Sequence, residues 1–116
     1  MAMTLGEKQE LFSRMVPGLM LKAFQLGFEI RLGDAFRDPR VHGELGKKVG
    51  YGHKNSNHKN KLAIDLNLRH QDGEMVTDTE GHRELGEWWE KQHELCRWGG
   101  RFADGNHYAL WHNGMM

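Results

Sequence analysis

The chain has 116 residues, of which 38% are hydrophobic, and this is enough to build the core of one domain. Its sixteen basic and sixteen acidic side chains cancel. This balance argues against strong electrostatic binding to nucleic acid or to an acidic membrane surface. Since no stretch of about 18 apolar residues is present, we expect no membrane-spanning helix and no stable membrane association.

Cysteine usage and the first residues bear on the cellular compartment. Cys96 is the only cysteine, so an internal disulfide is impossible and the chain is compatible with a reducing cytosol. Residues 1–8 lack a basic segment followed by an apolar run, so we expect no classical signal peptide. We expect a single-domain monomer spanning residues 1–116.

The first predicted element is an amphipathic helix. Thr4 and Glu7 form a capping-box pattern at its start, and Gly27 is suited to its end. Pro17 and Gly18 should kink or split it. The apolar positions recur every three or four residues: Leu11, Phe12, Met15, Val16, Leu19, Met20, Ala23 and Phe24. We interpret it as a core helix rather than a membrane or partner helix, because it leads directly into a strand-like segment.

Residues 28–32 alternate in polarity and predict a short strand. A turn follows at 33–39, and the glycine-rich stretch 40–51 predicts a short helix or an irregular loop. The polar loop 52–61 contains several Asn and Lys residues. We interpret it as the solvated rim of an active site rather than as a nucleic-acid patch, because the total charge is neutral and no aromatic residues are interleaved.

Residues 62–69 predict the central strand, and a turn at 71–73 leads to a returning strand at 74–76. The next helix should run from 79 to 96, with Asp78 or Thr79 as its cap.

Within this helix, Trp88 and Trp89 are either a sugar-stacking pair or one core anchor with one partly exposed ring, and we favour the second interpretation. After a glycine-broken connection at 98–102, a turn at Asp104 leads into a last strand that reaches Trp111.

The residues with the chemistry of a metal site are His58, Asp65 and His107. Asp65 falls on the predicted central strand, and His58 lies in the loop that precedes it. Two imidazoles and one carboxylate are a ligand set that catalytic zinc uses, with water in the fourth position. Other divalent ions accept the same ligands.

Three further residues complete the hypothesis of a hydrolytic centre. Asp104 lies three residues before His107, and Gly105 would permit the bend that brings both side chains to one site. Asp104 could then act as the general base. Arg37, in the turn after the first strand, is the candidate partner for the developing oxyanion.

The histidine content of the chain leaves an alternative open. Taken alone, His58 and His107 are each explained as well by ordinary surface or core histidines. Six others lack a carboxylate in a comparable setting: His42, His53, His70, His82, His93 and His112. Of these, His53 and His112 could lie near the site, whereas His82 and His93 are expected on a helix surface.

Two separated segments together resemble one enzyme family. S-N-H-K-N-K-L-A-I-D at 56–65 and W-G-G-R-F-A-D-G-N-H-Y-A-L at 98–110 look like the zinc peptidases that cut bacterial cell-wall peptides. These are the D-alanyl-D-alanine carboxypeptidases and dipeptidases and the bacteriophage L-alanyl-D-glutamate endopeptidases. The resemblance runs from A-F-R at 35–37 to Tyr108. It implies an α+β fold of the Hedgehog/DD-peptidase type, with helices packed on a small antiparallel sheet.

The resemblance also implies roles for individual residues. It assigns His58, Asp65 and His107 as zinc ligands and Asp104 as the catalytic base. Arg37 would bind substrate and the oxyanion, and Ser56, which matches the family's serine, would help to bind substrate.

The chain also departs from the family pattern. Lys61 stands where the family often has glycine, and the usual glutamine after the arginine is not evident between Asp38 and Gly46. Asp rather than Glu at position 104 is closer to the phage branch.

The expected function is therefore a zinc-dependent peptidoglycan peptidase of the phage endolysin type, acting on the stem peptide at the L-alanyl-D-glutamate bond. Such an enzyme would accumulate in the host cytoplasm and reach the wall during lysis. A D-alanyl-D-alanine carboxypeptidase or dipeptidase is the alternative within the enzyme class. Outside it, the alternatives are a non-catalytic zinc-binding module and, against the charge balance, a nucleic-acid accessory protein using the 53–61 loop.

Overall fold

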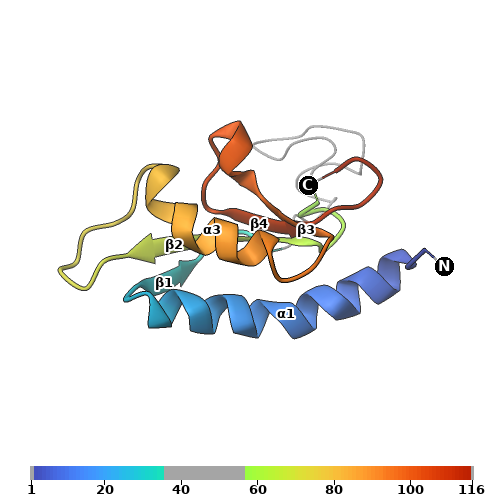
Figure 1. Ribbon diagram of the computed structural model, residues 1–116, viewed down its shortest axis with the longest axis horizontal. Helices are drawn as coiled ribbons and strands as arrows, with labels where there is room; N and C mark the ends of the chain where they lie inside the picture. The colour runs from blue at the N-terminus through green and yellow to red at the C-terminus, as the bar shows by residue number, and fades with distance from the viewer. Residues whose placement is uncertain (1, 36–56, 116) are drawn as a thin grey trace.

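The computed structural model describes residues 2–35 and 57–115, and within them two helices pack on a four-stranded antiparallel sheet (Figure 1). The helices are α1 (Leu5–Gln25) and α3 (Arg83–Glu90). The strands are β1 (Glu29–Leu32), β2 (Ala63–Arg69), β3 (Cys96–Trp98) and β4 (His107–Leu110), in the order β1-β2-β4-β3. The predicted α+β class is confirmed, with β2 and β4 at the centre of the sheet.

Helix α1 begins with the predicted capping box. The backbone N–H of Glu7 donates to Thr4 Oγ1 at 3.1 Å, and the N–H of Thr4 donates to Glu7 Oε1 at 2.9 Å. The helix is not split at Pro17 but continues through it. Pro17 has no N–H to donate to the carbonyl of Ser13. Ser13 lies on the exposed side of the helix, where water can donate to that carbonyl instead.

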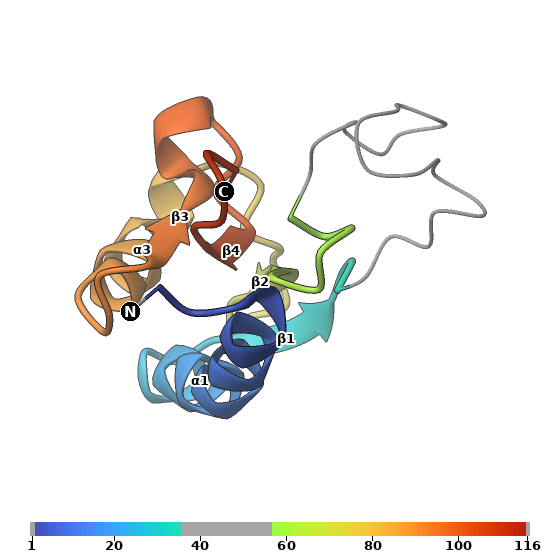
Figure 2. The ribbon, with the colours of Figure 1, turned by 90° about the vertical axis from the view of Figure 1, so that its right-hand side faces the viewer.

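The core lies between the helices and one face of the sheet (Figure 2). Phe12 of α1 meets Trp89 of α3 edge to face, with ring centroids 6.1 Å apart. The buried side chains that surround this pair are Leu19, Leu66, Leu68, Leu85, Tyr108 and Leu110. Both the core interpretation of the first helix and the division of roles between Trp89 and the partly exposed Trp88 are confirmed. Neither described helix is apolar enough over a sufficient length to cross a bilayer.

The returning strand predicted at 74–76 does not form. Only a single bridge joins Arg69 to Met75, next to a hydrogen bond from the N–H of Val76 to the carbonyl of Leu68. The chain then turns away, because Asp78 Oδ1 accepts a hydrogen bond from the N–H of Gly81 and starts the short 3-10 helix η1 (Glu80–His82).

The helix predicted at 79–96 is also shorter than expected. It comprises η1 and α3 and ends at Glu90. Cys96 belongs to β3 instead, where it pairs with Leu110 of β4. The apolar spacing that suggested four helical turns therefore combines two elements, and the turn at 91–95 separates them.

The predicted solvated loop at 52–61 is wrong for residues 57–60, whereas Lys61 is exposed as expected. Asn57, His58, Lys59 and Asn60 are all buried. They form a tight turn in which the N–H of Leu62 donates to the carbonyl of Asn57 at 2.9 Å. Residues 52–56 of that loop, and the segment predicted at 40–51, lie outside the described residues.

Candidate metal centre

Asp65 and His107 are brought together by the pairing of the two central strands. They are direct partners in the antiparallel register of β2 and β4, so their side chains project from the same face of the sheet. The neighbouring residues Ile64 and Leu66 project from the opposite face, into the core between the sheet and the helices. Strand alternation thus places the carboxylate and the imidazole on the face opposite the helices.

Gly33 allows the chain to pass close to Asp65. The N–H of Gly33 donates to the Asp65 carbonyl at 2.8 Å, just beyond the end of β1. A Cβ at position 33 would lie 2.9 Å from Asp65 Cβ, closer than two such atoms approach. A side chain there would displace Asp65 from its position opposite His107.

His58 reaches the same point from the tight turn before β2. The residue is only 1% exposed. The turn closes through a hydrogen bond from the N–H of Lys61 to the carbonyl of His58 at 3.3 Å, and Lys61 itself has a left-handed φ of 60°. Glycine is the residue that favours this backbone conformation, so the lysine at this position costs backbone free energy.

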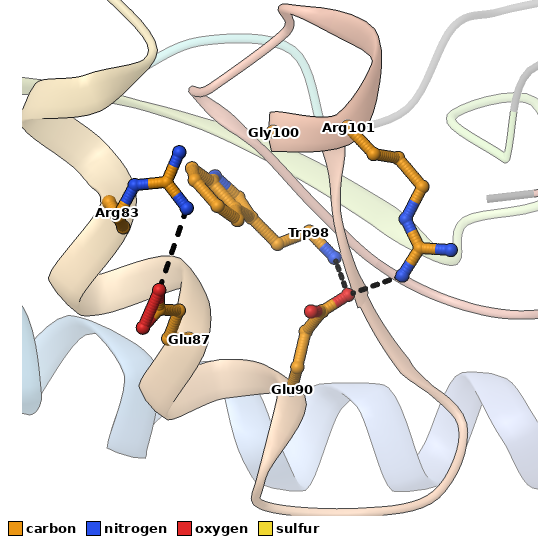
Figure 3. A pocket seen from close by; sticks show the side chains of 6 residues that line it. All are labelled: Arg83, Glu87, Glu90, Trp98, Gly100 and Arg101. Atoms are coloured by element: carbon orange, nitrogen blue, oxygen red, sulfur yellow. Dashed lines mark hydrogen bonds and ion pairs between the residues drawn. The ribbon is translucent and has the colours of Figure 1, made fainter.

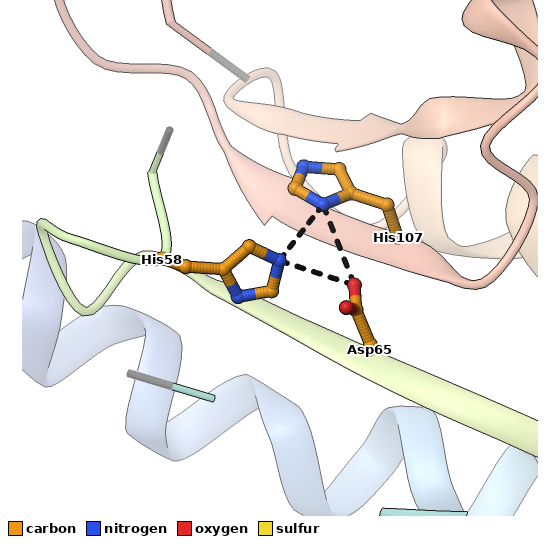
Figure 4. Close-up of side chains that lie close together, drawn as sticks. All are labelled: His58, Asp65 and His107. Carbon is orange, nitrogen blue, oxygen red and sulfur yellow. Dashed lines mark hydrogen bonds and ion pairs between the residues drawn. The ribbon is translucent and has the colours of Figure 1, made fainter. Parts of the chain in front are cut away.

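The three side chains converge on one point (Figure 4). His58 Nε2 lies 3.1 Å from Asp65 Oδ1 and 3.3 Å from His107 Nδ1, and His107 Nδ1 lies 3.6 Å from Asp65 Oδ1. Tetrahedral zinc with ligand bonds of about 2.0–2.2 Å separates neighbouring ligand atoms by roughly 3.3–3.6 Å. The separations and the ligand types therefore fit a metal ion, although they do not define which one.

The electrostatics of the centre keep Asp65 ionised. Its burial opposes ionisation, but hydrogen bonding and charge interaction with His107 and His58 outweigh burial and lower the pKa of Asp65 to about 2. An ionised carboxylate is the form that binds a cation. The ordinary pKa of an aspartate is about 4, and that of Asp65 is lower, so its carboxylate is ionised and able to bind a cation at any pH above about 4.

Asp104 lies at the open side of this cluster. Its Oδ2 is 4.0 Å from His107 Nδ1, and its side chain is 60% exposed. The position is fixed by backbone hydrogen bonds, from the N–H of Asp104 to the carbonyl of Gly99 and from the N–H of His107 to the carbonyl of Asp104. A carboxylate next to the ligands and open to solvent is placed to exchange protons with a water molecule.

Gly105 is required for a reason different from the predicted one. It does not have a positive φ; the left-handed residue of this segment is Ala103, with φ 57°. A Cβ at position 105 would lie 2.7 Å from the Cα of Thr79. Gly105 therefore permits close packing of the Asp104 turn against the segment before η1, and this packing holds Asp104 next to His107.

Not every predicted site residue can be placed. Arg37, Ser56 and His53 lie outside the described residues. His112 contacts Lys8 Nζ at 3.1 Å and is not a member of the metal-binding group. His82 is not on a helix surface as expected but is 3% exposed, with its Nδ1 2.9 Å from the Tyr108 hydroxyl.

A polar pocket of about 280 Å³ lies on the helix side of β3 (Figure 3). Its lining consists of Arg83, Glu87, Glu90, Trp98, Gly100 and Arg101. The guanidinium groups pair with the two glutamates at 3.5 and 3.4 Å, so the charges of the lining balance. None of the metal-site residues lines this pocket. The Trp98 ring forms part of its wall, and Arg83 Cζ lies 5.7 Å from the centroid of that ring.

Comparison of the chain with protein-family models and with curated proteins gives no match. The assignment of a metal site therefore rests on the type and geometry of the residues. Sequence reasoning missed two that support it, Asn57 and Trp98. The side chain of Asn57 donates a buried hydrogen bond to the carbonyl of Leu110, 53 residues away, and that of Trp98 donates one to the carbonyl of Gly105, 7 residues away. Neither contact follows from strand or helix periodicity.

Proposed function

We propose that this chain is a zinc-dependent peptidase of the phage endolysin type, which hydrolyses the peptidoglycan stem peptide between L-alanine and D-glutamate. The observation that carries the proposal is the convergence of His58, Asp65 and His107 at 3.1–3.6 Å, with the Asp104 carboxylate 4.0 Å from His107. The resemblance of the 56–65 and 98–110 segments to cell-wall peptidases supports the choice of substrate.

His58, Asp65 and His107 would hold the ion, which when bound activates water near neutral pH and polarises the scissile carbonyl. Asp104 accepts the proton that the attacking water loses as its oxygen bonds to the alanine carbonyl carbon. When the C–N bond breaks, Asp104 returns that proton to the amine of D-glutamate. Arg37 and Ser56, assigned by resemblance alone, would bind the substrate, and Arg37 would also stabilise the oxyanion.

Metal content is the first test of this proposal. The purified protein should contain about one zinc per chain, and His58→Ala should lose it because two ligands are too few for a stable site. His112→Ala is the matched control, since this histidine contacts Lys8 and lies outside the metal-binding group. Equal zinc in the wild type and the His58 variant would contradict the proposal.

The bond cleaved is tested separately. Digestion of purified peptidoglycan should release fragments with a new D-glutamate N-terminus, identified by mass spectrometry. Release of free D-alanine without that terminus would instead identify a D-alanyl-D-alanine carboxypeptidase. Stoichiometric zinc without any cleavage would favour a non-catalytic metal-binding module.

A further inference from the structure

The side chain of Asn57 is completely buried and fully engaged. Its Nδ2 donates hydrogen bonds to the backbone carbonyls of Leu110 at 2.7 Å and Met115 at 2.9 Å. Its Oδ1 accepts a hydrogen bond from Asn60 Nδ2 at 3.1 Å. Both N–H groups of the amide are therefore used, and they join the segment that begins at Asn57 to β4 and to the turn that follows it, 53 and 58 residues further along the chain.

These bonds connect the parts of the chain that hold two of the three candidate ligands. Asn57 immediately precedes His58, and Leu110 lies three residues after His107 on β4. A backbone hydrogen bond from Leu110 N–H to the carbonyl of Leu62, at 2.9 Å, fastens the other end of the same turn. The 57–62 turn is thus attached to β4 at both of its ends.

The third segment is a tight turn that the sequence specifies locally. His112 and Met115 exchange backbone hydrogen bonds of 3.0 and 2.8 Å, and the two residues between them, Asn113 and Gly114, have φ of 48° and 80°. Asn-Gly is the pair that favours such a turn. It directs the carbonyl of Met115 back towards Asn57.

The same turn is fastened to helix α1. Lys8 is 8% exposed, and its Nζ lies 3.1 Å from His112 Nδ1 and 5.5 Å above the ring of Trp111. Gln9, the next residue of α1, donates from Nε2 to the carbonyl of Asn60 at 2.9 Å. Helix α1, the 112–115 turn and the His58 turn therefore form one connected framework.

We propose that Asn57 is a positioning residue of the metal centre, which sets the distance between His58 and His107 without touching the ion. The inference rests on the proposed metal binding and adds to it a determinant of affinity outside the ligands. Without the amide, the His58 turn loses one of its two attachments to β4, and the carbonyls of Leu110 and Met115 each lose one donor. Residues that orient metal ligands commonly change affinity by about 10–100-fold, and we expect an effect of this size.

The test is the zinc affinity of Asn57→Ala, measured by competition with a chromophoric chelator. The matched control is Trp89→Phe. Trp89 is equally buried, and its Nε1 also donates to two strand carbonyls, those of Arg97 and Ala109, at 3.1 Å. Each variant loses a donor that is shared by two backbone carbonyls through one buried and one partly buried hydrogen bond, but only Asn57 belongs to the His58 turn. Zinc affinity should fall about 10–100-fold in Asn57→Ala and remain near the wild-type value in Trp89→Phe.

Two further measurements separate positioning from loss of structure. Circular dichroism establishes that each variant is folded, and the visible spectrum of bound Co²⁺ reports the ligand geometry, which should change in Asn57→Ala alone. If Asn57→Ala does not fold, Gly114→Val provides the test, because it disturbs the turn that supplies the Met115 carbonyl while leaving Asn57 in place. It should also weaken zinc binding.

The results that would overturn the inference are distinct from those that overturn metal binding. Wild-type affinity with an unchanged Co²⁺ spectrum in folded Asn57→Ala, or in Gly114→Val where that variant is used, would remove the positioning role. So would an equal loss of affinity in Trp89→Phe. By contrast, a wild-type protein that binds no zinc, or a His58→Ala variant that binds it equally well, would refute the proposed centre itself.

Discussion

The indole N–H of Trp98 donates a buried hydrogen bond of 2.7 Å to the backbone carbonyl of Gly105. Gly105 lies between the candidate base Asp104 and the candidate ligand His107. The ring packs directly against the backbone of Gly86 and Gly100, where a Cβ would lie only 2.1 or 2.3 Å from its atoms. Trp98 therefore fixes the turn that brings the two functional groups together.

Replacing Trp98 with Phe should lower the free energy of unfolding by about 1–3 kcal/mol, since the Gly105 carbonyl stays buried without its donor. Urea denaturation at constant zinc concentration measures this change. Trp88→Phe is the control, because Trp88 of α3 is only partly buried. Equal effects of the two variants would show that the Gly105 hydrogen bond has no special importance.

Asp104→Asn should retain zinc and fold normally but lose hydrolysis by about 10²–10⁴-fold, the usual contribution of a general base. The amide has nearly the same shape as the carboxylate and cannot accept the water proton. Zinc content and the rate of peptidoglycan digestion are measured on the same preparation. Undiminished digestion by this variant would remove Asp104 from the mechanism.

Lys61 has a φ of 60°, a left-handed backbone conformation that is unfavourable for a residue with a Cβ. Lys61→Gly and Lys61→Ala both remove the side chain, so their difference isolates the backbone. The glycine variant should be more stable than the alanine variant by about 1 kcal/mol. Chemical denaturation of both gives the comparison, and a more stable alanine variant would contradict the left-handed conformation.

His82 should make stability depend on pH. Burial lowers the pKa of His82, although the charges of Asp78 and Asp104 partly oppose this effect. The unfolded chain then binds a proton more readily than the folded chain. Stability is full above about pH 6.5, the ordinary imidazole value, and falls as the pH decreases from there towards the lowered pKa of the folded state.

The measurement is the urea midpoint between pH 5 and 8 in the presence of a chelator, for the wild type and for His82→Gln. The slope with pH should be smaller in the variant, because one buried histidine no longer titrates on unfolding. His93→Gln is the control, since His93 is only partly buried. Identical slopes in the wild type and His82→Gln would exclude this source of pH dependence.

Zinc should also stabilise the fold, because the three ligands meet only in the folded chain. At 100 times its dissociation constant, the ion should add about 2.7 kcal/mol to the free energy of unfolding. For a domain of this size, Tm should rise by roughly 10 °C. Calorimetry with zinc and with a chelator tests this. The rise should vanish in His58→Ala and persist in His112→Ala, and a rise in both would place the ion elsewhere.

Local patterns predicted much of the fold and of the site. The capping box at Thr4 and the alternation along β2 are short-range signals, and both are confirmed. Asp65 and His107 were recognised as residues of one site, and cross-strand pairing brings them together. The ligand chemistry could be read from sequence because it depends on residue type and on strand alternation.

Long-range packing explains what the sequence did not predict. Polar residues at 57–60 resemble a solvated loop, yet they are buried. The first of them, Asn57, bonds to carbonyls of β4 and of the 112–115 turn. Leu95 and Cys96 continue a helical spacing but belong to the segment that pairs with β4, where the N–H of Trp111 donates to the carbonyl of Leu95. Such partners lie far along the chain, beyond any local window.

Strand β4 comes last along the sequence among the described strands, yet it occupies an inner position, between β2 and β3. During synthesis, β2 and β3 leave the ribosome before the strand that joins them. The sheet and the metal-binding group must therefore be completed in the same event, when His107 comes to lie opposite Asp65. A nascent chain still lacking β4 can pair only β1 with β2 and cannot gather the three candidate ligands, so uptake of the ion would mark the moment at which this sheet closes.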